Sequence, residues 1–168
     1  GAAVIGPLMT SGKIDVLAFI GSTKVADILK KQHPEPHRMR SVLGLGAKNA
    51  GIFLSDCDLE LAAREALTGS LSFNGQRCTA LKILFVHSSI ADAFINKYVA
   101  LLEQLKIGMP WEDGVFLTPL PEPGKPEYFT GLVEEALNHG ARVMNPGGGT
   151  VNRTFFYPAI LYPVNDKM

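Results

Sequence analysis

The chain of 168 residues has little cysteine, no net charge and no long hydrophobic run. Its 16 basic and 16 acidic residues cancel, so the sequence lacks the excess positive charge that proteins binding nucleic acids or anionic membranes carry. No apolar run approaches the roughly 20 residues that a membrane-spanning helix needs. Its two cysteines, Cys57 and Cys78, do not have the spacing of a disulfide scaffold. We therefore expect reduced thiols, a cytoplasmic location, and neither a nucleic-acid nor a membrane partner.

Metal-binding patterns are lacking as well. His33 and His37 stand four residues apart on a segment broken by prolines, with no third ligand nearby, which favours a surface loop. Asp56 and Asp58 lack the further acids of a calcium loop, and we expect them to cap the helix that follows. The glycines at 147–149 are not followed by the Lys-Ser/Thr pair of a P-loop, so they predict a flexible turn. We expect no metal site.

Short apolar runs of strand length alternate with amphipathic segments of helical period. Strands are predicted over residues 14–20, 49–54, 81–87, 141–144 and 154–161, and helices over 23–31, 59–71, 90–105 and 126–139. This alternation predicts an α/β fold with a mainly parallel sheet and flanking helices. A long loop is expected over 107–125, where Trp111 would bury its ring.

A glycine-containing turn presents one cysteine between a helix and a strand. Residues 72–80 read Ser-Phe-Asn-Gly-Gln-Arg-Cys-Thr-Ala. A thiolate attacks carbonyl carbons, and nearby N–H groups or a cation such as Arg77 lower the pKa of a thiol from its usual value of roughly 8.5. His87 lies beyond a strand and is expected to point away from this turn. Cys78 is therefore a candidate nucleophile, and an inert packing residue is the alternative.

A second candidate site follows the first predicted strand. Gly21 and Ser22 precede a helix, and the free N–H groups of a helix N-terminus bind phosphate groups. The alternative is an ordinary helix cap that uses Ser22 or Thr23.

Three segments in the same order resemble motifs of the aldehyde dehydrogenase family. Residues 74–79 resemble the cysteine signature of this family, 17–23 resemble its cofactor-contacting Phe-x-Gly-Ser-Thr turn, and 47–59 resemble the stretch that leads to the cysteine. The amino-acid sequence of residues 71–82 and 120–126 is most similar to that of the NADP-dependent, non-phosphorylating glyceraldehyde-3-phosphate dehydrogenase branch of this family.

The resemblance also implies a domain organisation. Members of the family are much longer, so the chain looks like an internal segment. Residues 1–40 would be the C-terminal part of the dinucleotide-binding domain, and residues 41–168 a catalytic domain that is incomplete at its C-terminal end. The full-length protein would be a homo-oligomer.

The chemistry that the resemblance implies is oxidation of a small aldehyde, glyceraldehyde 3-phosphate in this branch, to a carboxylate with NADP or NAD. Cys78 would form the thioester and supply its backbone N–H as an oxyanion donor. Arg77 and Thr79 would bind the substrate, with the guanidinium on its phosphate; an ion pair or a helix-end contact is the alternative for Arg77. Gly21 and Ser22 would bind the cofactor.

One position departs from the family pattern. The usual segment is Leu-Glu-Leu-Gly-Gly-Lys, whose glutamate activates the water that releases the acid, but alignment through Lys48 places Gly44 there. General-base catalysis is worth about 10²–10⁴-fold, so hydrolysis should be slow while acylation could survive. Three explanations of this departure stay open: another carboxylate replaces the glutamate, the chain is an engineered trap, or it is a non-catalytic relative that serves packing or assembly. So does a thiol esterase that uses Cys78 without a cofactor.

Overall fold

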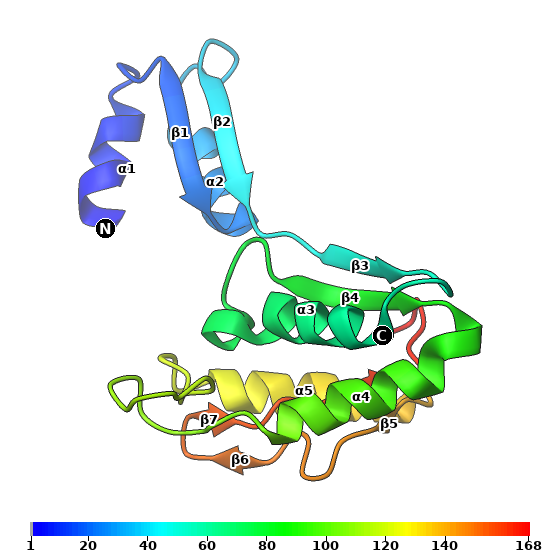
Figure 1. Cartoon of the computed structure of the whole chain (residues 1–168). Helices are drawn as coiled ribbons and strands as arrows, with labels where there is room; N and C mark the ends of the chain where they lie inside the picture. The colour runs from blue at the N-terminus through cyan, green and yellow to red at the C-terminus, as the bar shows by residue number, and fades with distance from the viewer. Residues whose placement is uncertain (1) are drawn as a thin grey trace. The chain divides into compact units, whose positions relative to one another are not determined.

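The computed structural model describes residues 2–168, which belong to two compact units, residues 1–48 and 49–168. Each unit contains a strand, a helix and a second strand parallel to the first (Figure 1). This arrangement confirms the predicted α/β fold with parallel strands and flanking helices. The units divide after Lys48, because the strand over 40–45 pairs within the first unit.

The first unit is built from α1 (Ala2–Thr10), β1 (Val16–Gly21), α2 (Thr23–Gln32) and β2 (Arg40–Leu45). β1 and β2 run in parallel, from Val16 opposite Arg40 to Gly21 opposite Leu45. Its small core consists of Met9, Leu17, Leu29 and Met39.

The loop after α2 differs from expectation. His33 is buried, with 4% of its surface exposed, whereas His37 is exposed as predicted. The loop folds back so that the ring of Pro34 lies against Gly12, and the His33 Nδ1 accepts a hydrogen bond of 3.1 Å from the Glu35 N–H. The expectation of a surface position was therefore wrong for His33. Within residues 2–168, no three His, Cys, Asp or Glu side chains gather closely enough to hold a metal ion.

The second unit begins with β3 (Asn49–Phe53), α3 (Leu59–Leu71) and β4 (Leu81–Val86), with β3 and β4 parallel. The short helix η1 (Ser72–Gly75) follows α3, and η2 (Ser88–Ile90) precedes α4 (Ala91–Glu103). The remaining elements are α5 (Lys125–Asn138), β5 (Arg142–Val143), β6 (Val151–Asn152), β7 (Phe155–Phe156) and β8 (Leu161–Tyr162). β5 pairs with β8 and β6 with β7, both in antiparallel fashion.

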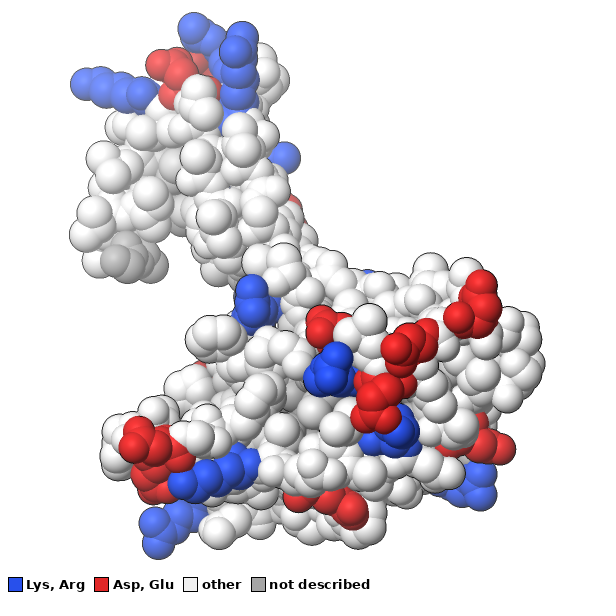
Figure 2. Space-filling model, in the orientation of Figure 1, with Lys and Arg blue, Asp and Glu red and all other residues white. Residues whose placement is uncertain are grey.

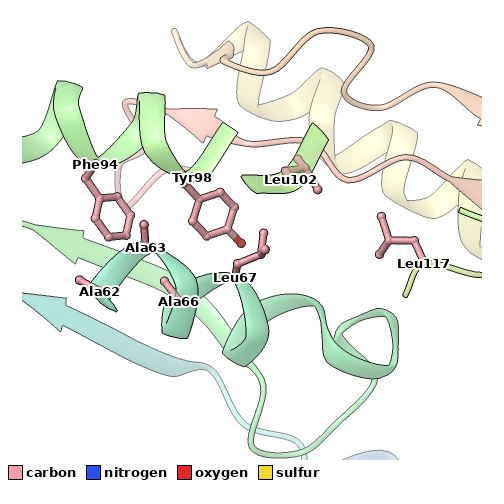
Figure 3. Close-up of a cluster of buried hydrophobic side chains, with 8 residues drawn as sticks. All are labelled: Ala62, Ala63, Ala66, Leu67, Phe94, Tyr98, Leu102 and Leu117. Carbon is pink, nitrogen blue, oxygen red and sulfur yellow. The ribbon is translucent and has the colours of Figure 1, made fainter. Parts of the chain in front are cut away.

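The core of the second unit lies between α3 and α4. Figure 3 shows small side chains of α3 facing aromatic side chains of α4. The cluster comprises Ala62, Ala63, Ala66, Leu67, Phe94, Tyr98, Leu102 and Leu117. Because alanine occupies little volume, the two helices approach closely and the rings fill the space between them. This packing fixes the C-terminal end of α3, from which the cysteine turn leaves.

The prediction of one strand over 154–161 is wrong, because this segment forms parts of two strands, β7 and β8, which pair with different partners. Pro158 stands between them and has no N–H to donate to a ladder. The side chain of Asn145 replaces the missing partner strand: its Nδ2 donates to the Pro158 carbonyl at 2.9 Å, and its Oδ1 accepts from the Ile160 N–H at 2.8 Å.

The expectation that Trp111 buries its ring is also wrong. Trp111 is 75% exposed, and the long loop is instead anchored by the buried Leu117 and Leu120. Before α4, the short helix η2 has His87 as its N-terminal cap, with a ring nitrogen accepting from the Ser89 N–H.

Charged side chains of both signs lie near one another on the face shown in Figure 2. Ion pairs join Glu60 to Lys97, Glu35 to Arg38 and Glu122 to Lys125. Of the helices described within residues 2–168, none has the length and apolar character needed to cross a membrane.

Candidate functional site

Cys78 sits in the connection between α3 and β4, as the sequence predicted. Two successive turns make this connection. The Gln76 N–H donates to the Phe73 carbonyl at 3.0 Å, and the Ala80 N–H donates to the Arg77 carbonyl at 3.1 Å. Cys78 is the second residue of the latter turn, is exposed and carries a free thiol. Its sulfur is thus accessible to a substrate.

The carbonyl groups around Cys78 are held by a side chain of β3. The Asn49 Nδ2 donates to the Cys78 carbonyl at 2.6 Å and to the Ala80 carbonyl at 3.1 Å. Asn49 itself is fixed, because it pairs with Leu81 at the start of the parallel ladder. The Lys82 Nζ donates to the Gly75 carbonyl at 2.7 Å. The turn that carries Cys78 is therefore tied to the sheet.

A cavity of about 180 Å³ adjoins this turn. Its lining is mostly polar and comprises Glu65, Thr68, Gly69, Ser72, Arg77, Thr79 and Ala80. Cys78 stands between two of these residues in the chain. The structure thus brings the predicted substrate residues Arg77 and Thr79 to one cavity, whose lining does not include Cys78 itself. The cavity suits a small polar molecule.

The side chain of Arg77 is exposed, and its guanidinium carbon lies 5.4 Å from the centroid of the Phe73 ring. Stacking on an aromatic face orients a guanidinium while leaving its N–H groups able to donate. Of the ion pairs described within residues 2–168, none includes Arg77, so the alternative of a structural ion pair is not seen there.

The other cysteine has a different environment. Cys57 is half-buried and packs against the core of the second unit, as expected of a structural residue. Next to it, the Asp58 carboxylate accepts a hydrogen bond of 3.0 Å from the Leu61 N–H and caps α3, which confirms the predicted cap. The His87 Nδ1 lies 2.9 Å from the Ser89 hydroxyl, in keeping with the expectation that His87 is no base for Cys78.

The predicted cofactor residues lie in the first unit. Gly21 ends β1 and Ser22 caps α2, with its hydroxyl accepting from the Val25 N–H at 3.3 Å. The cap that the sequence offered as an alternative is therefore present. It leaves the N–H groups of Thr23 and Lys24 without helical partners. The first turn of α2 carries no acidic residue. Exposed positions at this end of the helix include Gly21, Ser22, Thr23 and Lys24. This end of α2 suits an anionic group.

Gly44 also lies in the first unit, on β2, opposite Ile20 of β1. A Cβ atom placed there would lie 3.3 Å from the Cγ1 of the exposed Ile20 side chain. A Cβ atom at this position therefore requires a small shift of Ile20.

Sequence reasoning missed Asn49 and the helical part of the cavity. Asn49 contacts a residue that is 29 positions away, which no local pattern shows. The cavity residues of α3 and η1 did leave a signal. They stand at positions 65, 68, 69 and 72, the i, i+3, i+4, i+7 spacing of one helical face, and this face is polar or glycine.

Comparisons with known proteins identify the family of the chain. The sequence profile described as "Aldehyde dehydrogenase family" matches residues 1–168. The chain is 37% identical over 154 residues to alpha-aminoadipic semialdehyde dehydrogenase of Bos taurus, covering 91% of this chain and 28% of the relative. It is also 37% identical over 142 residues to NADP-dependent glyceraldehyde-3-phosphate dehydrogenase of Streptococcus equinus, covering 83% and 29%.

Solved structures give the same result. The crystal structure of NADP-dependent glyceraldehyde-3-phosphate dehydrogenase from Bacillus halodurans C-125 complexed with NADP superposes with a TM-score of 0.82 at 34% identity. The match covers 96% of this chain and 33% of that one. The chain thus spans about a third or less of the length of these relatives. Because the family profile matches its whole length, the chain belongs to the aldehyde dehydrogenase family.

Proposed function

We propose that Cys78 is the nucleophile of an NADP-dependent oxidation of a small anionic aldehyde, such as glyceraldehyde 3-phosphate, to its carboxylate. The observation that carries this proposal is an exposed residue with a free thiol, flanked in the chain by Arg77 and Thr79, which both line a polar cavity. Structural cysteines are ordinarily buried in apolar surroundings, as Cys57 partly is, so this exposure favours a chemical role for Cys78.

The first step follows from the turn geometry. The Cys78 thiolate attacks the carbonyl carbon, a C–S bond forms, and the carbonyl electron pair moves to oxygen. Within residues 2–168, no group accepts a hydrogen bond from the Cys78 N–H, so this N–H is free to donate to the developing oxyanion. Gly21 and Ser22 would hold the NADP, which would supply the hydride acceptor that this oxidation needs, and Cys78 would keep the acyl group as a thioester.

The final step is attack of water on the thioester, which breaks the C–S bond, gives the carboxylate and restores the thiolate with release of two protons. In this chain Gly44 occupies the position of the family's usual base. We infer that this hydrolysis is the slow step, because no side chain at that position takes the proton from water.

The cavity chemistry favours an anionic substrate. The guanidinium of Arg77 is permanently charged and presents several N–H donors to phosphate or carboxylate oxygens. The hydroxyl groups of Thr68, Ser72 and Thr79 add donors on the same cavity wall. Relatives of similar identity carry names with different aldehydes, such as alpha-aminoadipic semialdehyde and salicylaldehyde, so identity does not select the substrate. The choice of glyceraldehyde 3-phosphate rests on Arg77 and on the relatives named for it.

The cofactor assignment rests on α2. Gly21 and Ser22, with the free N–H groups of the first helical turn and the ammonium of Lys24, would hold the negatively charged pyrophosphate. The structures named as complexes with NADP support NADP as this cofactor. NAD stays the alternative.

Several whole-protein features stay predictions. These are the assignment of residues 1–40 to the dinucleotide-binding domain and of residues 41–168 to the catalytic domain, assembly of the full-length protein into a homo-oligomer, and a cytoplasmic location.

The proposal is tested by NADPH fluorescence after the chain is mixed with glyceraldehyde 3-phosphate and NADP. We expect NADPH up to about one equivalent per chain in the wild type and none in Cys78→Ser. Release of p-nitrophenol from an activated ester without NADP, together with no NADPH from the aldehyde, would instead indicate the thiol esterase. Inactivity in both assays would indicate a non-catalytic role.

A further inference from the structure

The turn before Cys78 has an unusual backbone. Phe73, Asn74 and Gly75 all have positive φ angles, of 54°, 55° and 68°. Glycine adopts this left-handed conformation readily and asparagine tolerates it, but a bulky aromatic residue there is an outlier. Such conformations persist only where the surroundings hold them in place, and they concentrate at functional sites.

The side chain of Asn74 supplies this restraint. Its Nδ2 donates to the Thr118 carbonyl at 3.0 Å and to the Thr118 hydroxyl at 2.8 Å, and its Oδ1 accepts from the Thr118 N–H at 3.0 Å. One amide therefore uses both of its ends on a single residue that is 44 positions away in the sequence. We call these three hydrogen bonds the amide clamp.

The far end of the clamp is immobilised by the core. Thr118 lies between Leu117 and Leu120, which are 2% and 8% exposed. The Leu120 N–H also donates to the Thr154 carbonyl at 2.9 Å. The clamp thus attaches the left-handed turn to a fixed part of the second unit, and both Asn74 and Thr118 are half-buried, where hydrogen bonds are less exposed to competing water.

We propose that Asn74, through its clamp to Thr118, is a positioning residue for Cys78. The turn over 73–76 sets the direction in which the chain enters the turn over 77–80, and this direction fixes where the thiol and the N–H of Cys78 lie. The inference rests on the proposed function of Cys78 as a nucleophile that also supplies an oxyanion donor. Loss of the clamp would leave the thiol reactive but would disturb the alignment that carbonyl attack requires.

Two electrophiles separate alignment from simple reactivity. p-Nitrophenyl acetate acylates the thiol: a bond forms from sulfur to the acetyl carbon, and p-nitrophenolate leaves with the electron pair of the ester C–O bond. This reaction passes through an oxyanion and benefits from an aligned donor. Iodoacetamide alkylates the thiol by direct displacement of iodide and needs no oxyanion donor. Peptide mass spectrometry of the full chain measures each rate at Cys78, with Cys57 as the internal reference.

The variants distinguish the effect of losing the hydrogen bonds of the clamp from the effect of added backbone strain. Asn74→Gly suits the left-handed conformation but removes all three hydrogen bonds, whereas Asn74→Ala removes them and adds strain. Thr118→Val removes only the hydroxyl acceptor, and Thr118→Ser retains it, so this milder pair keeps the test usable where an Asn74 variant fails to fold. Asn145→Ala is the matched control, because Asn145 makes a similar two-ended amide contact, but with Pro158 and Ile160.

We expect Asn74→Gly to lower the acylation rate at Cys78 by about tenfold or more, as expected when an oxyanion donor is misplaced, with little change in alkylation. Thr118→Val should lower acylation less, Thr118→Ser should restore it, and Asn145→Ala should leave both Cys78 rates unchanged. The inference would be overturned if Cys78 in Asn74→Gly is acylated at the wild-type rate, or if its acylation and alkylation rates fall equally. If wild-type Cys78 is acylated no faster than Cys57, the nucleophile assignment itself fails, and the inference fails with it.

Discussion

The side-chain amide of Asn49 donates a hydrogen bond of 2.6 Å to the backbone carbonyl of Cys78. This contact joins the first residue of β3 to the exposed turn that carries the candidate nucleophile. A parallel β-α-β unit brings the two strand starts together, so the residue that begins one strand can hold the loop that leads into the other.

We expect Asn49→Ala to destabilise the chain by about 1 kcal/mol, because two carbonyl groups lose a charge-neutral hydrogen bond each and are partly rehydrated. Urea unfolding measures this change. Asn96→Ala, on the exposed face of α4, is the control and should change stability little. An Asn49→Ala variant as stable as the wild type would show that the contact contributes nothing to the turn.

Arg77 should determine affinity for an anionic substrate. We expect Arg77→Lys to raise by about tenfold the glyceraldehyde 3-phosphate concentration that gives a half-maximal rate of NADPH formation in the single turnover, since an ammonium cannot replace the planar set of guanidinium donors. The half-maximal concentration of propionaldehyde, which has no anionic group, should stay the same. If both concentrations rise together, Arg77 shapes the turn and does not bind phosphate.

Gly44 should explain slow release of the product. Introducing the family's glutamate by Gly44→Glu should convert a single turnover into repeated turnover, with a gain of about 10²-fold or more in the steady-state rate. The Cβ atom of the new side chain would lie 3.3 Å from the Ile20 Cγ1, so Ile20 has to shift slightly. Gly44→Gln is the matched control and should stay at one turnover. Equal rates for the two variants would show that the missing carboxylate is not what limits hydrolysis.

The free energy of unfolding should fall at alkaline pH because of the buried Tyr98. Burial raises the pKa of this phenol above its ordinary value of 10.0, and a hydrogen bond with Ser70 partly opposes the rise. Because the unfolded chain then ionises first, the stability that Tyr98 contributes is full below about pH 10 and falls as the pH rises further. Urea midpoints from pH 8 upward should therefore decline less steeply above pH 10 in Tyr98→Phe than in the wild type. Parallel declines would contradict this role.

Local patterns predicted most of the fold. The helix over 59–71 coincides with α3, because its alanine-rich face and its Asp58 cap are both local features. The strand over 154–161 failed because Asn145 supplies partners that a strand would otherwise have supplied. The burial of His33 also escaped prediction, since it depends on the packing of Pro34 against Gly12 in a distant part of the unit.

The site was predictable only where it is contiguous. Arg77, Cys78 and Thr79 are neighbours in the chain, so one motif identified all three. Asn49 and Thr118 reach the same turn from 29 and 44 positions away, and their amide and hydroxyl groups have no local signature. The left-handed conformation of Phe73 was equally hidden, because aromatic residues rarely adopt it.

The central claim, that Cys78 is the nucleophile, is tested most directly by intact mass spectrometry after the chain is mixed with glyceraldehyde 3-phosphate and NADP. We predict an acyl adduct on Cys78 that persists, forms with at most about one equivalent of NADPH, and is absent from Cys78→Ser. The absence of an adduct on the wild-type chain, with Cys78 alkylated no faster than the half-buried Cys57, would contradict the account.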